Sequence, residues 1–319
     1  MVELDASTIG ERLDRAIVAA LARSGVVCTR SQLARAFVDQ LVSSDGRTLQ
    51  PGRPQTRVMK VELDLPQPEP LRAEPEPLPL RVVYEDEAVL VVDKPAHMPV
   101  HASIGHVRGT LVNAVLAHLN VGASELPVLP GNDAMRPGIV HRIDMDTSGL
   151  LVVTKTFTAQ TSLARQFREH HIERSYLGIV VGNPNETRFE LDTLHGRDPN
   201  QRKRFSPMVA RGRRARTTVV VEQQLRGACV CRFYLDTGRT HQIRMHAAHI
   251  GHPILADALY GARPRDPAIC EVALQLGRHA LHATTLGFVH PLTGAWIRLD
   301  SPLPDELMRA ILQLGGNPV

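Results

Sequence analysis

Aromatic side chains, cysteines and long apolar runs are all scarce in this chain of 319 residues. Aromatic residues make up 4% of the composition, so extended stacking on single-stranded bases is not expected to be the main mode of binding. No apolar run approaches the roughly 20 residues that a membrane-spanning helix requires. The acidic start at Met1–Asp5 lacks the apolar core of a secretion signal, so we expect a cytoplasmic protein with no membrane partner.

The four cysteines are scattered at positions 28, 229, 231 and 270. Cys229 and Cys231 are separated by one residue, which places both thiols on the same face of a strand, a poor geometry for a disulfide. We therefore expect reduced cysteines that pack in the core, in keeping with a cytoplasmic location.

Several catalytic signatures are also missing. The segment His141-Arg142-Ile143-Asp144 differs from a kinase loop by one inserted residue, and no Gly-x-Gly-x-x-Gly occurs upstream. Ser148 is not framed as Gly-x-Ser-x-Gly, which excludes a serine hydrolase elbow. The histidines at 241, 246, 249 and 252 lack both a His-Glu-x-x-His pattern and a nearby cysteine pair. We predict no metal site, and a metal hydrolase is the remotest of the alternatives.

Basic charge is concentrated in one segment, although the net charge is only +4. Between Arg197 and Arg216 there are eight arginines and lysines against one acid, Asp198. This composition fits either a solvated mobile loop or an arm that grips phosphates.

Residues 1–64 are expected to form a small unit of their own. Ile9, Leu13, Ile17 and Leu21 recur every four residues, which indicates an amphipathic helix. Thr29 is a candidate N-cap for a second helix over 30–41, with Leu33, Phe37 and Leu41 on one side. Asp45-Gly46 is a turn signal that leads to strand-like segments ending at Val58–Leu63.

A linker and a larger domain are expected to follow. Six prolines and three glutamates punctuate residues 65–80, so this segment should be extended and semi-rigid. In the domain 81–319, helices are predicted at 110–119 and around Ala159, Leu163 and Phe167. Strands are predicted at Val82–Tyr84, Ala88–Asp93, Leu150–Lys155, Tyr176–Val181, Thr217–Val221, Cys229–Asp236 and Thr284–Val289. This order predicts an α+β fold with a mixed, mostly antiparallel sheet flanked by helices and loops.

The densest motif is His141–Leu150, which combines two acids, a His-Arg pair and a Thr-Ser-Gly turn directly before an apolar run. Such a charged loop fixed on a buried strand is a typical place for chemistry, and Asp144 lies at its centre. Another polar cluster begins at Gly238–His246 and continues to Asp257 and Tyr260, to which no individual role is assigned.

Taken together, the motifs resemble those of the RluA-type family of RNA pseudouridine synthases. The matching segments are His141-Arg142-Ile143-Asp144, then Thr147-Ser148-Gly149-Leu150, then Gly238-Arg239-Thr240-His241-Gln242-Ile243-Arg244, in this order. The first 64 residues resemble the small α/β S4-like RNA-binding domain through Arg12-Leu13-Asp14 and Thr29–Leu33, although a generic helical cap domain remains possible. His97 stands where the family usually has glycine, and Ala102 where proline is common.

The resemblance implies that uridine in RNA is isomerised to pseudouridine, a reaction that needs no cofactor. It gives Asp144, Tyr176 and Arg244 the catalytic roles: the reacting carboxylate, the ring against the target base and the partner of the carboxylate. Arg142 would fill the gap left by the flipped base, and Leu281 would form an apolar wall. Contacts to loop or RNA would come from His141, Thr147, Gly238, Arg239, Thr240, His241 and Gln242. His141 is expected mainly to shape its loop.

The expected substrate is large-subunit ribosomal RNA, modified by a monomeric enzyme. Transfer RNA is the alternative substrate. A different class of function is a non-catalytic RNA-binding or ribosome-assembly factor with the same fold. The intact set of Asp144, Tyr176 and Arg244 argues against that alternative.

Overall fold

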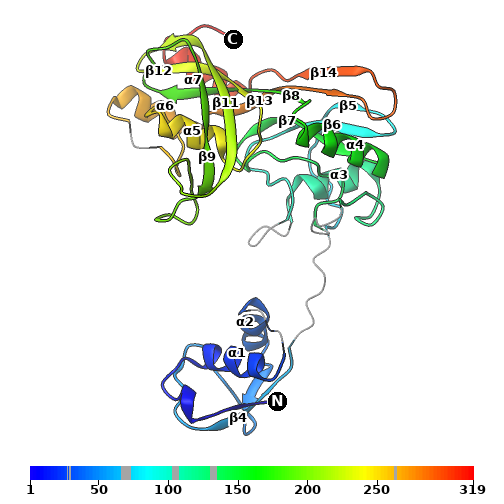
Figure 1. Ribbon diagram of the computed structural model, residues 1–319, viewed down its shortest axis with the longest axis vertical. Coiled ribbons are helices and arrows are strands. Elements are labelled where there is room, and N and C mark those ends of the chain that lie inside the picture. Colours follow the sequence, from blue (N-terminus) through cyan, green and yellow to red (C-terminus); the bar gives the residue numbers. More distant parts are fainter. Residues whose placement is uncertain (27, 29, 66–72, 103–107, 130–134, 262–263) are drawn as a thin grey trace. The chain divides into compact units, whose positions relative to one another are not determined.

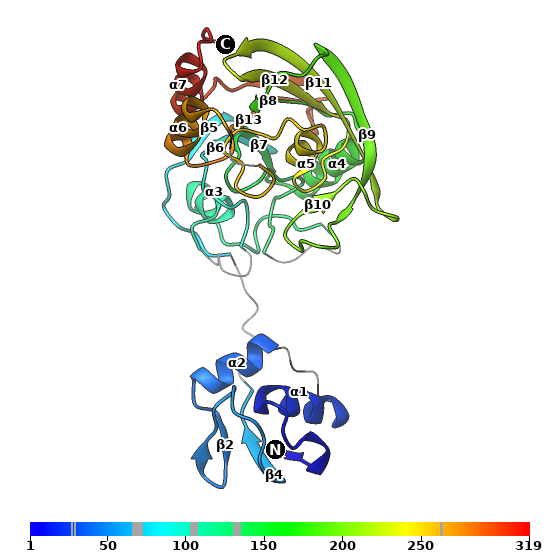
Figure 2. The same cartoon turned by 90° about the vertical axis from the view of Figure 1, so that its left-hand side faces the viewer.

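The computed structural model describes residues 1–319 except 27, 29, 66–72, 103–107, 130–134 and 262–263. The chain divides into two compact units, Met1–Leu71 and Arg72–Val319 (Figures 1 and 2). Among the described residues, no helix is long and apolar enough to span a membrane.

The first unit is a four-stranded antiparallel sheet covered by two helices. Its elements are β1 (Val2–Leu4), the 3-10 turn η1 (Ala6–Thr8), α1 (Leu13–Arg23), α2 (Arg30–Val38), β2 (Val42–Ser44), β3 (Arg47–Thr48) and β4 (Met59–Leu63). The sheet order is β1-β4-β2-β3. The expected helix faces are confirmed at Leu13, Ile17 and Leu33, which are buried in the core of this unit.

Two details of the expected helices were wrong. Ile9 precedes α1 and is half exposed, because Gly10 and Glu11 form a turn before the helix begins. Leu41 lies beyond the end of α2, since Gln40 takes a positive φ of 58° that ends the helix. The expected N-cap, Thr29, lies outside the described residues. The Asp45-Gly46 turn is confirmed: both residues have positive φ, as a two-residue hairpin requires.

The second unit is built on one ten-stranded sheet (Figure 2). Its elements in chain order are β5 (Arg81–Glu85), β6 (Val89–Lys94), α3 (Leu111–Leu119), β7 (Ser148–Thr154), α4 (Phe157–Arg168), β8 (Glu173–Val181), β9 (Arg188–Arg197), β10 (Phe205–Ser206), β11 (Arg213–Leu225), β12 (Ala228–Leu235), α5 (Gln242–His249), α6 (Pro267–Leu276), β13 (Leu281–Val289), β14 (Trp296–Asp300) and α7 (Asp305–Gln313). Strand order is β10-β9-β11-β12-β8-β13-β7-β6-β5, with β14 paired to β13.

The mixed, mostly antiparallel sheet predicted from the sequence is confirmed, because every ladder is antiparallel except the one between β13 and β7. That parallel ladder has only two residue pairs, His282 with Ser148 and Ala283 with Gly149. By comparison, β7 pairs with β6 over six residues, Val89–Lys94. The sheet is therefore two antiparallel halves joined along a short parallel seam.

Helices cover the sheet where the apolar faces require it. Helix α3 begins with a capping box in which Thr110 and Asn113 satisfy each other's backbone groups. Helix α4 packs against β7 and β13, and α5 packs against β10 and β11. The Asn113 side chain also donates to the backbone carbonyl of Glu74, and the backbone carbonyl of Asn113 accepts from Glu76 N–H. The second half of the proline-rich segment therefore lies on this unit.

The paired cysteines of β12 behave as the residue spacing predicts. Cys229 and Cys231 are both buried, and their sulfur atoms lie 3.4 Å apart as free thiols. They fill the core between sheet and helices in the manner of small apolar residues.

Candidate active site

The loop before β7 carries Asp144. Close packing of β7 against β13 at the parallel seam fixes where this loop ends. Gly149 has φ of +114°, and a Cβ at this position would lie 2.2 Å from the carbonyl oxygen of Ala283. No side chain fits there, so β7 and β13 approach each other at this point only because residue 149 is glycine. The backbone carbonyl of Asp144 closes a turn by accepting from Thr147 N–H at 3.1 Å.

Buried side chains from other segments hold the loop by its backbone. Lys94 is fully buried, and its Nζ donates to the carbonyl of Met145 at 2.9 Å as well as to two carbonyls of its own loop. Arg278 donates to the carbonyl of Asp146 at 3.0 Å. Thr147 Oγ1 lies 2.7 Å from Nε2 of the buried His279. Position and direction of Asp144 are thus set from three sides.

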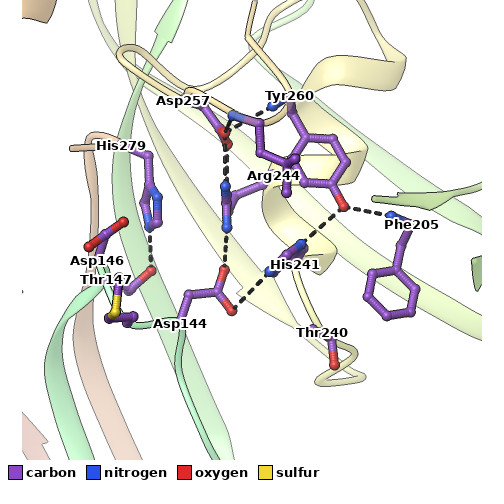
Figure 3. A network of polar contacts seen from close by, with 12 residues as sticks. Asp144, Asp146, Thr147, Phe205, Thr240, His241, Arg244, Asp257, Tyr260 and His279 are labelled. Atoms are coloured by element: carbon purple, nitrogen blue, oxygen red, sulfur yellow. Dashed lines mark hydrogen bonds and ion pairs between the residues drawn. The ribbon is translucent and has the colours of Figure 1, made fainter. Parts of the chain in front are cut away.

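An ion-pair network centred on Arg244 holds the carboxylate of Asp144. From α5, Arg244 Nη1 donates to Asp144 Oδ2 at 3.0 Å, while its Nε and Nη2 donate to both oxygens of Asp257 at 2.7 and 2.9 Å (Figure 3). The Asp257 side chain is fully buried. Burial opposes its charge, but the hydrogen bonds from Arg244 hold the pKa of Asp257 below its ordinary value.

The same network keeps the guanidinium charged. Burial alone would lower the pKa of Arg244, yet its bonds to Asp257 and Asp144 raise it above the ordinary value. Asp144 keeps a side chain that is 17% exposed, against 9% for Arg244. The carboxylate therefore sits at the floor of an opening with a fixed cation behind it.

A pocket opens in front of Asp144, with an empty volume of about 420 Å³ including its mouth. Tyr176 from β8 and Leu281 from β13 line it, and both are almost completely buried. They are brought together because Tyr176 pairs with Ala283, two residues along β13 from Leu281. Burial raises the pKa of Tyr176, so its hydroxyl stays protonated at neutral pH.

The pocket contains one arginine that was missed from the sequence, Arg174. It lies on the same strand face as Tyr176, two residues earlier, and this alternation is the signal that would have found it. Its Nη2 makes only long contacts, 3.4 Å, to the carbonyls of Leu235 and Asp236. A Cβ at Gly238 would lie 2.5 Å from Nη1 of Arg174. Glycine at 238 thus makes room for this guanidinium.

All the site residues predicted from the sequence line this pocket except His141 and Thr240. His141 stacks on Phe167 with ring centroids 4.5 Å apart, and its Nε2 accepts from Val152 N–H. Thr240 is exposed, and its carbonyl accepts from His195. In this structure both residues make contacts that support loops.

The side-chain polar groups of Gln242 are hydrogen-bonded inside the protein, whereas the guanidinium of Arg142 is not. The Gln242 side chain is buried and bonds to Thr237, Arg239 N–H, Arg216 O and Thr217, so it fixes the start of α5. Arg142 is exposed at the pocket, and among the described residues no acceptor bonds its guanidinium. Arg142 is therefore free to meet a ligand.

A second row of polar groups reaches the other carboxylate oxygen of Asp144, Oδ1. His241 Nε2 lies 4.0 Å from Asp144 Oδ1, and its Nδ1 lies 3.2 Å from the hydroxyl of Tyr260. The Tyr260 hydroxyl also accepts from Phe205 N–H at 2.8 Å (Figure 3). Neither Tyr260 nor Asp257 was given a role from the sequence.

The histidines considered as metal ligands have separate partners. His246 bonds to Thr193 and Thr217, and His252 bonds to the carbonyl of Val181. Within the described parts of the chain, no group of three His, Cys, Asp or Glu side chains could hold a metal ion.

The basic segment is partly strand and partly hairpin tip. Its ends belong to β9 and β11, where Arg214 pairs with Asp192 and Arg216 with Glu190, so these ends are strand and not loop. The partner acids come from β9, outside the segment in which the charges were counted. The tip between the strands, residues 198–212, presents exposed Arg202, Lys203 and Arg211. We call it the basic hairpin.

Comparison with known proteins gives a consistent result. Residues 88–249 match a family described as RNA pseudouridylate synthase. A "Ribosomal large subunit pseudouridine synthase D" from Zymomonas mobilis is 39% identical over 96% of this chain and 94% of its own length. The protein of the same name from Vibrio vulnificus is 38% identical over 95% of this chain and 90% of its own length. In fold, the chain resembles human RNA Pseudouridylate Synthase Domain Containing 4, with a TM-score of 0.56 at 20% identity, covering 73% and 92% of the two chains.

Proposed function

The chain belongs to the RNA pseudouridylate synthase family, and from that membership we propose that it modifies uridines in large-subunit ribosomal RNA. It is an isomerase that converts uridine to pseudouridine in RNA. In this reaction the bond between ribose and nitrogen 1 of uracil breaks, and carbon 5 of the turned uracil bonds to the same ribose carbon. The hydrogen at carbon 5 leaves as a proton and nitrogen 1 takes up a proton, so substrate and product have the same composition.

The observation that carries the assignment of the site is the carboxylate of Asp144 held between Arg244 and the pocket. A buried guanidinium 3.0 Å from Oδ2 orients the Asp144 carboxylate and provides its counter-charge when bound RNA excludes water. Such a carboxylate can attack the ribose, add to the base or take a proton from the ribose, and all three acts need it charged and oriented.

The walls of the pocket suit a single flipped base. We assign Tyr176 to one face of the uracil and Leu281 to the apolar edge, since both line the pocket in front of Asp144. Taking the base out of its stack costs a few kcal/mol. Arg142, exposed at the mouth, is placed to fill the vacated position and offset part of that cost.

Unneutralised cations support RNA as the ligand. Among the described residues, Arg142, Arg174 and Arg239 line the pocket without a carboxylate partner. Arg244 differs because two carboxylates already neutralise it. The three unpaired guanidiniums fit the phosphates on either side of a flipped nucleotide.

Pseudouridine mapping of total RNA tests this proposal. Cells lacking the gene are expected to lose one or a few pseudouridines in large-subunit ribosomal RNA, and wild-type protein restores them. The Asp144→Ala variant should not restore them. Asp146→Ala is the matched control, since its side chain pairs with His97 away from the pocket. Loss of sites only in transfer RNA would give the alternative substrate, and persistence of every site would refute catalysis.

We propose further that the first unit is an S4-like RNA-binding domain. A groove between α1 and α2 has Arg12 and Arg15 at its rim, and Arg15 is exposed. Charge reversal by Arg15→Glu in the full chain is expected to weaken RNA binding without changing the catalytic step at saturating RNA. An unchanged RNA affinity would contradict this role.

The protein is also proposed to act as a monomer in the cytoplasm. Light scattering on purified protein should give a mass near 35.1 kDa, and a dimer would contradict the proposal. Fractionation of cells should place the protein with the ribosomal particles of the cytoplasm.

A further inference from the structure

A row of polar contacts, two hydrogen bonds and one longer electrostatic contact, leads from the basic hairpin to the carboxylate of Asp144. Phe205 N–H donates to the Tyr260 hydroxyl at 2.8 Å, and this hydroxyl lies 3.2 Å from His241 Nδ1. His241 Nε2 faces Asp144 Oδ1 at 4.0 Å. Figure 3 shows these groups in a row that ends at Oδ1 of Asp144, the carboxylate oxygen that Arg244 does not bond.

The contact between Phe205 and Tyr260 bears on which ring nitrogen of His241 carries a hydrogen. A backbone N–H can only donate, so Phe205 uses a lone pair of the Tyr260 oxygen. The hydroxyl hydrogen of Tyr260 then needs an acceptor. Among the described residues, the one acceptor within hydrogen-bond distance is His241 Nδ1. Donation of this hydrogen to Nδ1 requires that Nδ1 itself carry no hydrogen.

The contact between His241 and Asp144 favours the same tautomer, with the hydrogen on Nε2. A neutral imidazole with a free Nδ1 carries its hydrogen on Nε2, which faces the charged oxygen of Asp144. The opposite tautomer would place a nitrogen lone pair against a carboxylate and leave the Tyr260 hydrogen without an acceptor. Two independent contacts thus select the Nε2–H tautomer.

The ring is neutral in its surroundings. Burial lowers the pKa of His241, and the nearby guanidiniums of Arg244 and Arg142 lower it further, against the opposing carboxylates of Asp144 and Asp257. The buried ring also meets Phe205 and Tyr260 edge-on, with centroids 5.9 and 5.6 Å away. These contacts fix the orientation of the ring plane, and burial keeps the ring uncharged.

We infer that Tyr260 and His241 are positioning residues that direct one N–H toward Oδ1 of Asp144, while Arg244 holds Oδ2. At 4.0 Å the His241 contact is electrostatic, so Oδ1 is oriented but remains open to the pocket. Its importance for the reaction rests on the proposed function of Asp144. The tautomer itself does not, because it follows from the contacts of the free protein.

The hairpin that supplies Phe205 also presents the exposed basic residues. The Phe205 ring stacks on His195 at 4.4 Å, and the Arg197 guanidinium lies 4.3 Å from its centre. Arg204, also in the basic hairpin, lies over the Tyr260 ring. RNA that holds this hairpin in place therefore also holds the donor that fixes Tyr260 and, through it, His241.

Nitrogen NMR of the full-length protein with ¹⁵N-labelled histidine measures the tautomer directly. We expect His241 Nδ1 to resonate in the unprotonated range and Nε2 in the protonated range. The His241→Gln variant identifies these signals by their loss. In Tyr260→Phe, which removes one hydroxyl, the two nitrogens should shift toward averaged values. Tyr84→Phe is the matched control, because it also removes a bonded hydroxyl, but one on β5 that bonds to Asp86.

Single-turnover kinetics on transcribed large-subunit ribosomal RNA supply the second readout. Tyr260→Phe is expected to slow the reaction about three- to tenfold, the effect of one neutral hydrogen bond, with RNA affinity unchanged. Tyr84→Phe should react at the wild-type rate. A His241 protonated on Nδ1, or a Tyr260→Phe spectrum identical to wild type, would overturn the inference. If the RNA is not a substrate, the proposed function fails, while the NMR result still decides between the tautomers.

Discussion

Asp257 provides the most direct test of how the site is held together, and the informative change is Asp257→Asn. The carboxylate is fully buried and accepts two bonds from Arg244 as well as the N–H groups of Leu259 and Tyr260. Asparagine keeps the shape and can still accept from the two N–H groups. It removes the charge, however, and turns an amide N–H₂ toward the guanidinium.

The expected cost follows from the burial of both partners. Arg244 is 9% exposed, so water cannot replace the lost charge, and Asp144 remains as its only carboxylate partner among the described residues. Breaking a buried ion pair by removing one partner costs about 3–5 kcal/mol. We expect the free energy of unfolding, measured by urea titration with far-ultraviolet circular dichroism, to fall by that amount. Release of tritium from carbon 5 of uridine should slow in the same variant.

Asp192→Asn serves as the control for this comparison. Asp192 also pairs with an arginine, Arg214, but its side chain is 41% exposed. Such a surface pair contributes less than about 1 kcal/mol. If Asp257→Asn unfolds at the same urea concentration as Asp192→Asn and wild type, Arg244 does not depend on its buried carboxylate and the reasoning is refuted.

Further predictions concern packing, pH and charge. Gly149→Ala places a Cβ 2.2 Å from the Ala283 carbonyl, so soluble expression and activity should both be lost, and wild-type stability would contradict the seam geometry. Burial lowers the pKa of His246, His279 and His282 to about 4 and that of His141 to about 3, from an unfolded value near 6.5. The unfolded chain therefore binds up to four more protons than the folded one as the pH falls through 6.5. The free energy of unfolding should be nearly constant at pH 7.5 and above and fall by up to about 5 kcal/mol per pH unit below pH 6.5, in urea titrations at pH 7.5 and 5.5. Charge reversal at Arg202 and Lys203 should weaken RNA binding and flatten its dependence on salt, whereas an unchanged affinity would remove the basic hairpin from the RNA interface.

The strands that the sequence predicts well are those with continuous apolar runs. Val89–Lys94, Ser148–Thr154 and Ala228–Leu235 are buried on both faces, so their composition alone marks them. Helix α5 escaped prediction because half of its buried residues are polar: Gln242, Arg244 and His246 all have hydrogen-bond partners inside the protein. Its first turn has no side-chain cap, so no start signal exists either.

Some features of the site follow from the motif and others only from the fold. Asp144 and Arg244 are 100 residues apart, and their predicted contact came from the family resemblance. The bidentate bond from Arg244 to Asp257 depends on how the chain turns after α5, which no local pattern specifies. His97 is the reverse case: its positive φ of 63° explains why glycine is usual at this position.

The parallel seam between β13 and β7 has a mechanical consequence. It is two residue pairs long, and it lies where the Asp144 loop enters the sheet and where Leu281 begins β13. Because only these two residue pairs join the strands of the two halves, we expect the sheet to resist shear least at this junction. Each half carries one side of the pocket, so we expect movement at the seam to change the separation of those two sides. Hydrogen exchange at the amides of Ser148 and Gly149, with and without RNA, would follow that movement directly.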